Sequence, residues 1–183
     1  MRPQPPYRGG TALTISAVTS RSEKSEICNT ILRALPNWFS VEEGIVECVR
    51  EVPNLLFFAA FADTHRHEGL RSQSERAENG QAIGFIALKN HNQYTAEVRV
   101  MAVLQAYHRH GVGRMLMERC VAECRRAGLT FLTVKTLDRS RASRNYEKTR
   151  MFYHAMGFRP LEVFPMFWDA ENPCLFMAMY LGK

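Results

Sequence analysis

The chain has no apolar run long enough to cross a membrane. Its longest, at residues 55–62, has the length of a single buried strand. The first ten residues, MRPQPPYRGG, contain no apolar segment behind the arginine, so we expect a flexible N-terminal arm and no signal peptide. These features predict a cytoplasmic protein with no membrane partner.

Closely spaced cysteine pairs of the kind that bind metal are also missing. The five cysteines are Cys28, Cys48, Cys120, Cys124 and Cys174. An odd number without a secretion signal favours reduced thiols in the cytoplasm. The histidine pairs His65/His67 and His108/His110 have no cysteine or carboxylate that would complete a four-ligand set, so we expect no metal site.

Acidic residues are scarce in one part of the chain. Between residues 105 and 160 there are twelve Lys or Arg and only four Asp or Glu, although the net charge of the whole chain is +6. This asymmetry favours an anionic partner, either a polyphosphorylated cofactor or a nucleic acid, and a solvated basic face is the alternative. With 46% hydrophobic and 23% charged residues, residues 11–183 are typical of a single globular domain.

Strand and helix patterns alternate along the chain. Strands are predicted at residues 11–18, 55–61, 81–89, 98–104, 129–137, 158–164 and 174–181, and helices at 20–35, 40–51, 112–127 and 146–156. Ser20 with Glu23 and Ser40 with Glu43 have the spacing of capping boxes. Residues 63–80 are expected to form a long loop, and residues 165–173 a connection between the last two strands. The order predicts an α/β or α+β fold with a partly antiparallel sheet.

A glycine turn joins the strand at 98–104 to the next helix. Gly111 and Gly113 flank Val112, the first apolar position of that helix. A strand, a glycine turn and a helix start place free N–H groups at one point, which is a site for an anion such as phosphate. Leu116 stands where a dinucleotide fold has its third glycine, and the turn lacks the Lys-Ser/Thr of a Walker loop. A tight turn before a core helix is the alternative.

Two motifs together resemble a known family. Residues 107–116, YHRHGVGRML, resemble the acyl-CoA-binding turn of the GNAT N-acetyltransferases, Gln/Arg-x-x-Gly-x-Gly/Ala. Residues 149–158, TRMFYHAMGF, resemble the later signature of that family, a helix that carries Phe-Tyr and ends in Gly-Phe. His108 departs from the pattern, which has Gln or Arg there. The resemblance implies the GNAT fold, a mixed and mostly antiparallel sheet splayed at its centre with helices on both faces.

The resemblance also implies a cosubstrate, acetyl-CoA, and a set of residues that bind it. The pyrophosphate would lie on the turn formed by His108, Arg109, His110, Gly111, Val112, Gly113 and Arg114. The pantetheine arm would pair with the strand edge at Met101, Ala102 and Val103. A main-chain N–H of Met101 or Ala102 would bind the acetyl carbonyl.

The implied reaction is direct attack of a primary amine on the thioester, in a ternary complex. Tyr153 matches the family's tyrosine, which protonates the departing thiolate, and Tyr146 on the same helix is a weaker substitute. The alternative for Tyr153 is a core residue that packs beside Phe152.

For the base we predict Glu97, which matches a glutamate of the histone-acetylating branch of the family. Strand alternation is expected to place Glu97 on the face of Met101 and Val103, with a water relay to the amine. A solvated carboxylate paired with Arg99 or Lys89 is the alternative, and His91 is the alternative base.

The acceptor stays open between a small amine and a lysine or N-terminal amine of a protein or peptide. Its walls are predicted at Trp38, Phe39, Phe167 and Trp168, with ordinary core packing as the alternative. A second hypothesis is a non-catalytic acyl-CoA-binding or regulatory module. A third and less favoured hypothesis is a basic nucleic-acid-binding domain. Both a monomer and a homodimer fit the sequence.

Overall fold

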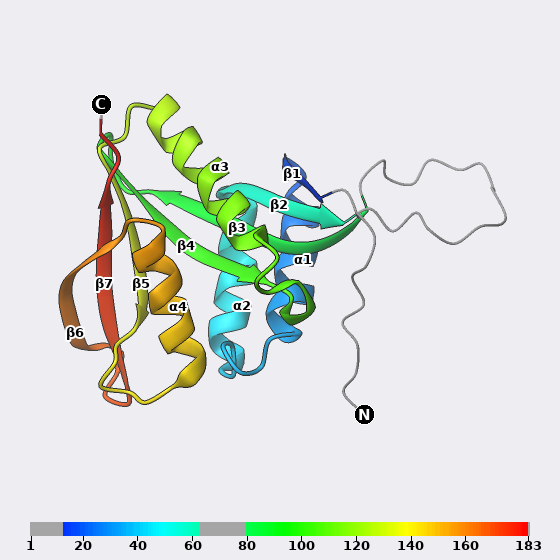
Figure 1. Cartoon of the computed structure of the whole chain (residues 1–183). Helices are drawn as coiled ribbons and strands as arrows, with labels where there is room; N and C mark the ends of the chain where they lie inside the picture. Colours follow the sequence, from blue (N-terminus) through cyan, green and yellow to red (C-terminus); the bar gives the residue numbers. More distant parts are fainter. Residues whose placement is uncertain (1–12, 63–79, 183) are drawn as a thin grey trace, which may run out of the picture.

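A single mixed sheet forms the centre of the computed structural model, which describes residues 13–62 and 80–182 (Figure 1). The elements are, in order, β1 (Leu13–Ala17), α1 (Arg21–Arg33), α2 (Glu42–Glu51), η1 (Val52–Asn54), β2 (Leu56–Ala62), β3 (Gln81–Asn90), β4 (Thr95–Val103), η2 (Gln105–Tyr107), α3 (Val112–Arg126), β5 (Phe131–Leu137), α4 (Arg144–Ala155), β6 (Arg159–Asp169) and β7 (Asn172–Tyr180). The strand order is β1-β2-β3-β4-β5-β7-β6. Neighbouring strands are antiparallel except for the parallel pair β4 and β5.

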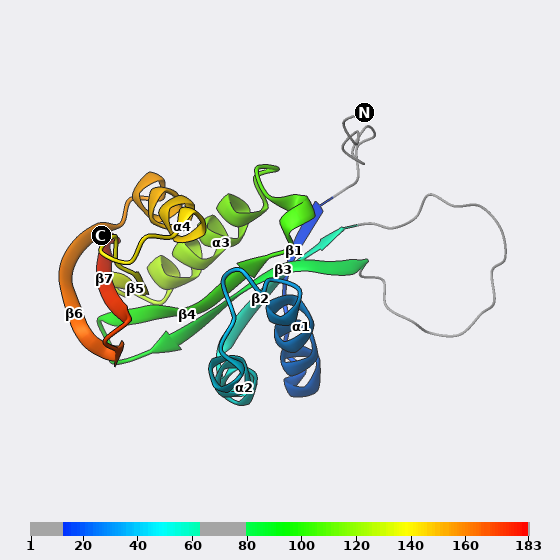
Figure 2. The same ribbon diagram turned by 90° about the horizontal axis from the view of Figure 1, so that it is seen from below.

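Helices cover both faces of the sheet, as the resemblance to the family implied. Figure 2 shows α1 and α2 on one face and α3 and α4 on the other. Strand β2 contributes to both layers, because Phe57 lies in the core beneath α1 and α2 while Phe58 lies in the core beneath α3. The two layers therefore have separate hydrophobic cores that share the sheet.

One of the two predicted helix caps is present. The Ser20 side chain accepts a hydrogen bond from the N–H of Glu23 at the start of α1. The prediction for Ser40 was wrong: α2 begins at Glu42, and its N-cap residue, Val41, makes no side-chain cap bond. Glu42 instead lies at the positive end of the helix dipole and pairs with Arg33 of α1 at 2.8 Å.

The predicted connection at residues 165–173 was also wrong in extent. Strand β6 continues to Asp169, so only a short turn separates it from β7. The Asp169 carboxylate accepts hydrogen bonds from the N–H groups of Glu171 and Asn172, which closes a tight hairpin. Pairing with β7 therefore ends at Phe164 and resumes at Asp169, where the aspartate turn begins, and neither feature shows in the apolar pattern.

The predicted loop at 63–80 and the N-terminal arm at 1–10 lie outside the described residues, apart from Gly80. Within the described part of the chain, no helix is both long and apolar enough to cross a membrane. The five cysteines are buried free thiols.

Candidate functional site

The centre of the sheet opens between β4 and β5. The two strands pair only from Thr95 with Phe131 to Val98 with Val134. Beyond these pairs β4 continues to Val103 and β5 to Leu137 without pairing to each other. Because the strands are parallel, their separated ends lie at the same edge of the sheet (Figure 1). The predicted central splay is confirmed.

A β-bulge in β4 lies next to this gap. Val98 pairs with Leu88 of β3 and Val100 pairs with the adjacent Ala87, so Arg99 is an extra residue with no partner in β3. Val98 belongs to the core beneath α3, whereas Val100 belongs to the core beneath α1 and α2. The alternation predicted for residues 98–104 is therefore interrupted at Arg99.

Because of the bulge, the predicted base does not share a face of the sheet with the strand residues that follow Arg99. Ala96 and Val98 both lie in the α3-side core, so Glu97 between them faces the opposite side of the sheet. Met101 and Val103 pack against the α3-side core. The prediction that Glu97 shares their face was wrong, because one inserted residue shifts every later side chain to the other face.

The turn between β4 and α3 has the geometry of an anion site. Gly111 is the N-cap of α3 and has a φ of 82°, in the left-handed region. Since glycine has no side chain, no side-chain cap occupies the first N–H groups of α3. Arg109 also has a positive φ, 67°, which costs a non-glycine residue conformational energy. Uncapped N–H groups at the positive end of a fifteen-residue helix favour an anion.

The two glycines of this turn have different requirements. A Cβ at Gly111 would have no atom within 4 Å, so what requires glycine there is the left-handed backbone. A Cβ at Gly113 would lie 3.4 Å from Met101 Cε and 3.4 Å from Phe152 Cε2. Gly113 therefore lets α3 begin close to both β4 and α4.

His108 lies along the open edge of β4. Its Nε2 is 2.7 Å from the Val103 carbonyl oxygen, and its ring makes an edge contact with Trp38 at 5.4 Å. The N–H of Leu104 donates to Ile83 in β3, so the Val103 carbonyl of the same peptide group points away from β3 and toward the gap. One edge group that the resemblance assigns to pantetheine is thus already bonded, although a carbonyl oxygen has a second lone pair.

Tyr153 lies in α4 within the α3-side core, where it is only 7% exposed. Its ring packs between Phe152 and Phe158, each 5.5 Å away between centroids. Burial raises the pKa of Tyr153, and Tyr146 and Cys120 act in the same direction. A phenol whose charged form is disfavoured by burial stays protonated and is suited to donate to an incoming anion.

Tyr146 is engaged elsewhere. Its hydroxyl donates to the main-chain carbonyl of Trp38 at 2.7 Å, and burial raises its pKa. Trp38 Nε1 in turn donates to Thr149 Oγ1 at 3.3 Å. These bonds fasten the segment between α1 and α2 to α4, so Trp38 and Tyr146 together connect the two layers beside the gap.

Glu97 is a buried carboxylate with two basic partners. It is 5% exposed, and its Oε2 lies 2.7 Å from both His91 Nε2 and Lys135 Nζ. The expected partners Arg99 and Lys89 pair instead with Glu51 of α2, at 2.5 and 3.2 Å.

Sequence reasoning missed Lys135. It alternates with the buried Leu132 and Val134 of β5, a sign that it faces the other side of the sheet. The parallel register, which pairs Glu97 with Thr133 two residues before Lys135, is not readable from the sequence.

Aromatic side chains surround Lys135 on this face. Its Nζ lies 5.3 Å from the Phe167 ring centroid and 5.8 Å from that of Phe176. Phe167 is 51% exposed and makes an edge contact with Trp168. Phe167 and Trp168 therefore form an exposed wall of this half of the sheet, whereas Phe39 and Trp38 belong to the segment between α1 and α2.

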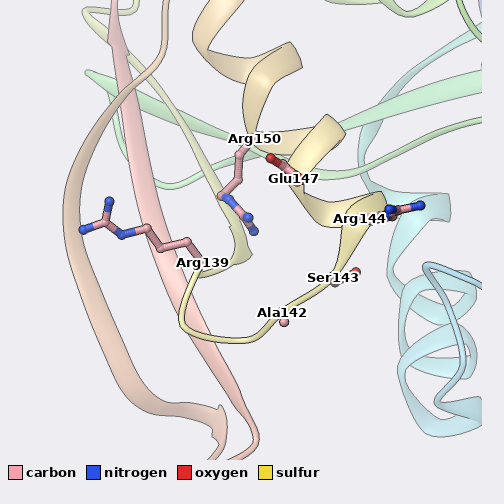
Figure 3. Close-up of a pocket in the computed structure, with 6 residues that line it drawn as sticks. All are labelled: Arg139, Ala142, Ser143, Arg144, Glu147 and Arg150. Atoms are coloured by element: carbon pink, nitrogen blue, oxygen red, sulfur yellow. The ribbon is translucent and has the colours of Figure 1, made fainter.

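A cavity of about 440 Å³ lies beside the loop between β5 and α4 (Figure 3). It is lined by Arg139, Ala142, Ser143, Arg144, Glu147 and Arg150. In Figure 3 Arg139 and Arg144 extend toward opposite sides, and Arg150 lies between them. Arg150 donates to the Leu137 carbonyl at 2.9 Å, which holds the loop to the end of β5. The cluster places positive charge at the end of the sheet where the gap opens.

Metal ligands do not gather in the described residues, where no three His, Cys, Asp or Glu side chains are placed to hold an ion. His65 and His67 lie outside the described residues.

Comparison with known proteins connects this geometry to a family. Residues 75–160 match the family model described as an acetyltransferase (GNAT) domain. An uncharacterized N-acetyltransferase of Chlorobaculum tepidum is 30% identical over 83 residues. That match covers 45% of this chain and 46% of the relative, so the chain matches less than half of the relative's length.

Solved structures share the fold over nearly the whole chain. A GNAT-family protein of Desulfovibrio desulfuricans superimposes with a TM-score of 0.72 at 16% identity, covering 93% of this chain and 100% of the other. A GNAT family acetyltransferase from Elizabethkingia anophelis, solved with acetyl-CoA bound, gives a TM-score of 0.60 at 15% identity and covers 92% and 97% of the two chains. At these identities the likeness establishes the fold.

Proposed function

We propose that the chain is a GNAT acetyltransferase and that it transfers an acetyl group from acetyl-CoA to a primary amine by direct attack in a ternary complex; the family-model match over residues 75–160 and the shared fold support this. One observation carries the proposal: the gap between β4 and β5 opens beside the uncapped start of α3. A thioester in the gap and a diphosphate at the helix start would belong to one extended ligand.

Acetyl-CoA would be held mainly by main-chain groups. The turn from His108 to Arg114 would bind the pyrophosphate through the first N–H groups of α3. The open edge of β4 at residues 101–103 would pair with pantetheine. The Val103 carbonyl would either accept from pantetheine in addition to its contact with His108 or exchange that contact for one with pantetheine.

One of the two candidate oxyanion donors fits the alternation better. The N–H of Leu104 bonds to β3, so the N–H of Ala102, two residues earlier, also points to β3. The N–H of Met101 then points into the gap. Met101 is therefore our choice for the donor that stabilises negative charge on the acetyl oxygen.

Acid and base would act from opposite faces of the sheet. Glu97, supported by His91, would remove a proton from the acceptor ammonium on the face that carries Phe167. Tyr153 would donate a proton to the leaving thiolate from the α3-side core. An amine that adds to the carbonyl from one face and a thiolate that is protonated from the other are compatible with a tetrahedral intermediate in the gap, which collapses by losing the thiolate.

The proposal is tested by thiol release from acetyl-CoA in the presence of a panel of small amines, peptides with free N-termini and lysine peptides. We expect acceptor-dependent CoA release together with calorimetric binding of acetyl-CoA. Binding without transfer to any amine would contradict the proposal and identify an acyl-CoA-binding module. Absence of binding would remove the whole assignment.

A further inference from the structure

Lys135 has a position in the sheet that no other lysine of residues 13–62 and 80–182 shares. It is the first residue of β5 after the last β4–β5 pair, Val98 with Val134, so it stands where the gap begins. Leu132 and Val134 face the α3-side core, so Lys135 faces the opposite side, the side of Glu97. This inference rests on the proposed function, which places the thioester in the same gap.

The surroundings of Lys135 form a complete site for an ammonium group. The Glu97 carboxylate, 5% exposed, lies 2.7 Å from Nζ, and two aromatic rings lie within 6 Å. A carboxylate with aromatic faces is the set of groups that binds a cationic amine. The protein's own side chain thus lies where the base of the proposed reaction would meet an amine.

We propose that Lys135 is acetylated by the protein's own active site. Glu97 removes a proton from the Lys135 ammonium, and the neutral Nζ attacks the acetyl carbonyl of acetyl-CoA. An N–C bond forms, the C–S bond breaks, and the departing thiolate takes a proton from Tyr153. The acylated nitrogen loses its second proton to solvent, from which Tyr153 regains one. The products are an Nε-acetyl-lysine at position 135 and free CoA.

Other nucleophiles of the chain are less well placed. Cys174 lies near the same carboxylate, but it is fully buried and burial raises the pKa of its thiol to about 11. Lys89 is paired with Glu51, and Lys148 is exposed on α4. Among the lysines and cysteines that the structure describes, Lys135 alone combines a contact with the proposed base and a position at the start of the gap.

Acetylation would change the site that it modifies. An acetylated Lys135 has no positive charge, so its ion pair with Glu97 is lost. Glu97 would then keep His91 as its partner and could accept a proton from an external amine. The modification would therefore convert a self-occupied ammonium site into one open to an acceptor.

The test is peptide mass spectrometry on the full-length protein after incubation with acetyl-CoA alone. We expect one acetyl group at Lys135, formed about tenfold or more faster than at Lys148, at a rate independent of protein concentration. Lys148→Arg should leave that rate unchanged, and Lys135→Arg should abolish the fast modification. Equal rates at the two lysines, or a Lys135 rate that rises with protein concentration, would overturn self-acetylation.

The failure of this inference can be separated from that of the proposed function. Turnover of an external amine with Lys135 unmodified overturns the inference alone. Absence of both acetyl-CoA binding and amine acetylation overturns the two together.

Discussion

Replacing Gly111 by alanine tests whether main-chain groups of the turn bind the diphosphate. Gly111 has a φ of 82°, and an added Cβ would have no atom within 4 Å. The cost is therefore conformational, about 1–2 kcal/mol for an L-residue in the left-handed region. A stiffer unfolded chain offsets about 0.4–1 kcal/mol of this. The net loss of unfolding free energy should be about 1 kcal/mol, or roughly 2–4 °C in Tm for a chain of this length.

Gly128→Ala is the matched control. Gly128 follows the other end of α3, has a φ of 74°, and also has no atom within 4 Å of an added Cβ. The two variants should lose similar stability in thermal or urea unfolding. Only Gly111→Ala should lose affinity for CoA in titration calorimetry, because a shifted turn misaligns hydrogen bonds worth about 1.5–3 kcal/mol each to a charged ligand.

The affinity loss at Gly111 should be about tenfold or more. If Gly111→Ala binds CoA as tightly as Gly128→Ala does while both lose stability, the turn does not hold the diphosphate. If both lose affinity equally, general destabilisation accounts for the effect.

Three further predictions concern the core and the site. Tyr153→Phe should lower kcat about tenfold or more with little change in acetyl-CoA affinity, whereas Tyr146→Phe should change kcat less; equal effects in a steady-state assay would remove Tyr153 as the acid. Thr136 has a buried hydroxyl without a partner among the described residues, so Thr136→Val should raise the unfolding free energy by about 1 kcal/mol. Thr133→Val should lower it by a similar amount, because that hydroxyl donates to a β4 carbonyl at 3.2 Å; urea unfolding compares the pair. Burial acts to raise the pKa of Glu51, but ion pairs with basic side chains of β3 and β4 outweigh it and leave this pKa below its ordinary value. The stability that ionised Glu51 contributes is therefore fully present above its unfolded-state pKa and is lost as the pH falls through its lower folded-state pKa. Glu51→Gln should make the midpoint of urea unfolding depend less on pH across that acid range.

Local signals in the sequence were sufficient for most of the elements. The Ser20 cap and the glycine turn at Gly111 each depend on residues a few positions apart. Where tertiary packing favoured a different boundary, the element boundary predicted from the local signal was wrong. The α2 helix starts one residue later than a Ser40 cap would require. Strand β6 extends to Asp169 because pairing with β7 resumes there, after an irregular stretch beyond Phe164.

The candidate site divides in the same way. The turn at 108–114 and the Phe-Tyr helix were visible as motifs, because their geometry is built into short segments of backbone. The bulge at Arg99 was not visible, since an extra residue in a strand appears only when the partner strand is in place. That single residue placed Met101 and Val103 on the opposite face of the sheet from Glu97.

The sequence by itself determined the helices, the strands and the glycine turn, because periodicity, caps and backbone freedom act over a few residues. Only the tertiary structure decided the parallel register of β4 and β5, the divergence of their ends and the contact of Glu97 with Lys135. These depend on pairing between residues far apart in the chain, here 38 positions for the carboxylate and its ammonium partner. Such a contact is fixed by the packing of the whole sheet, to which no local pattern is sensitive.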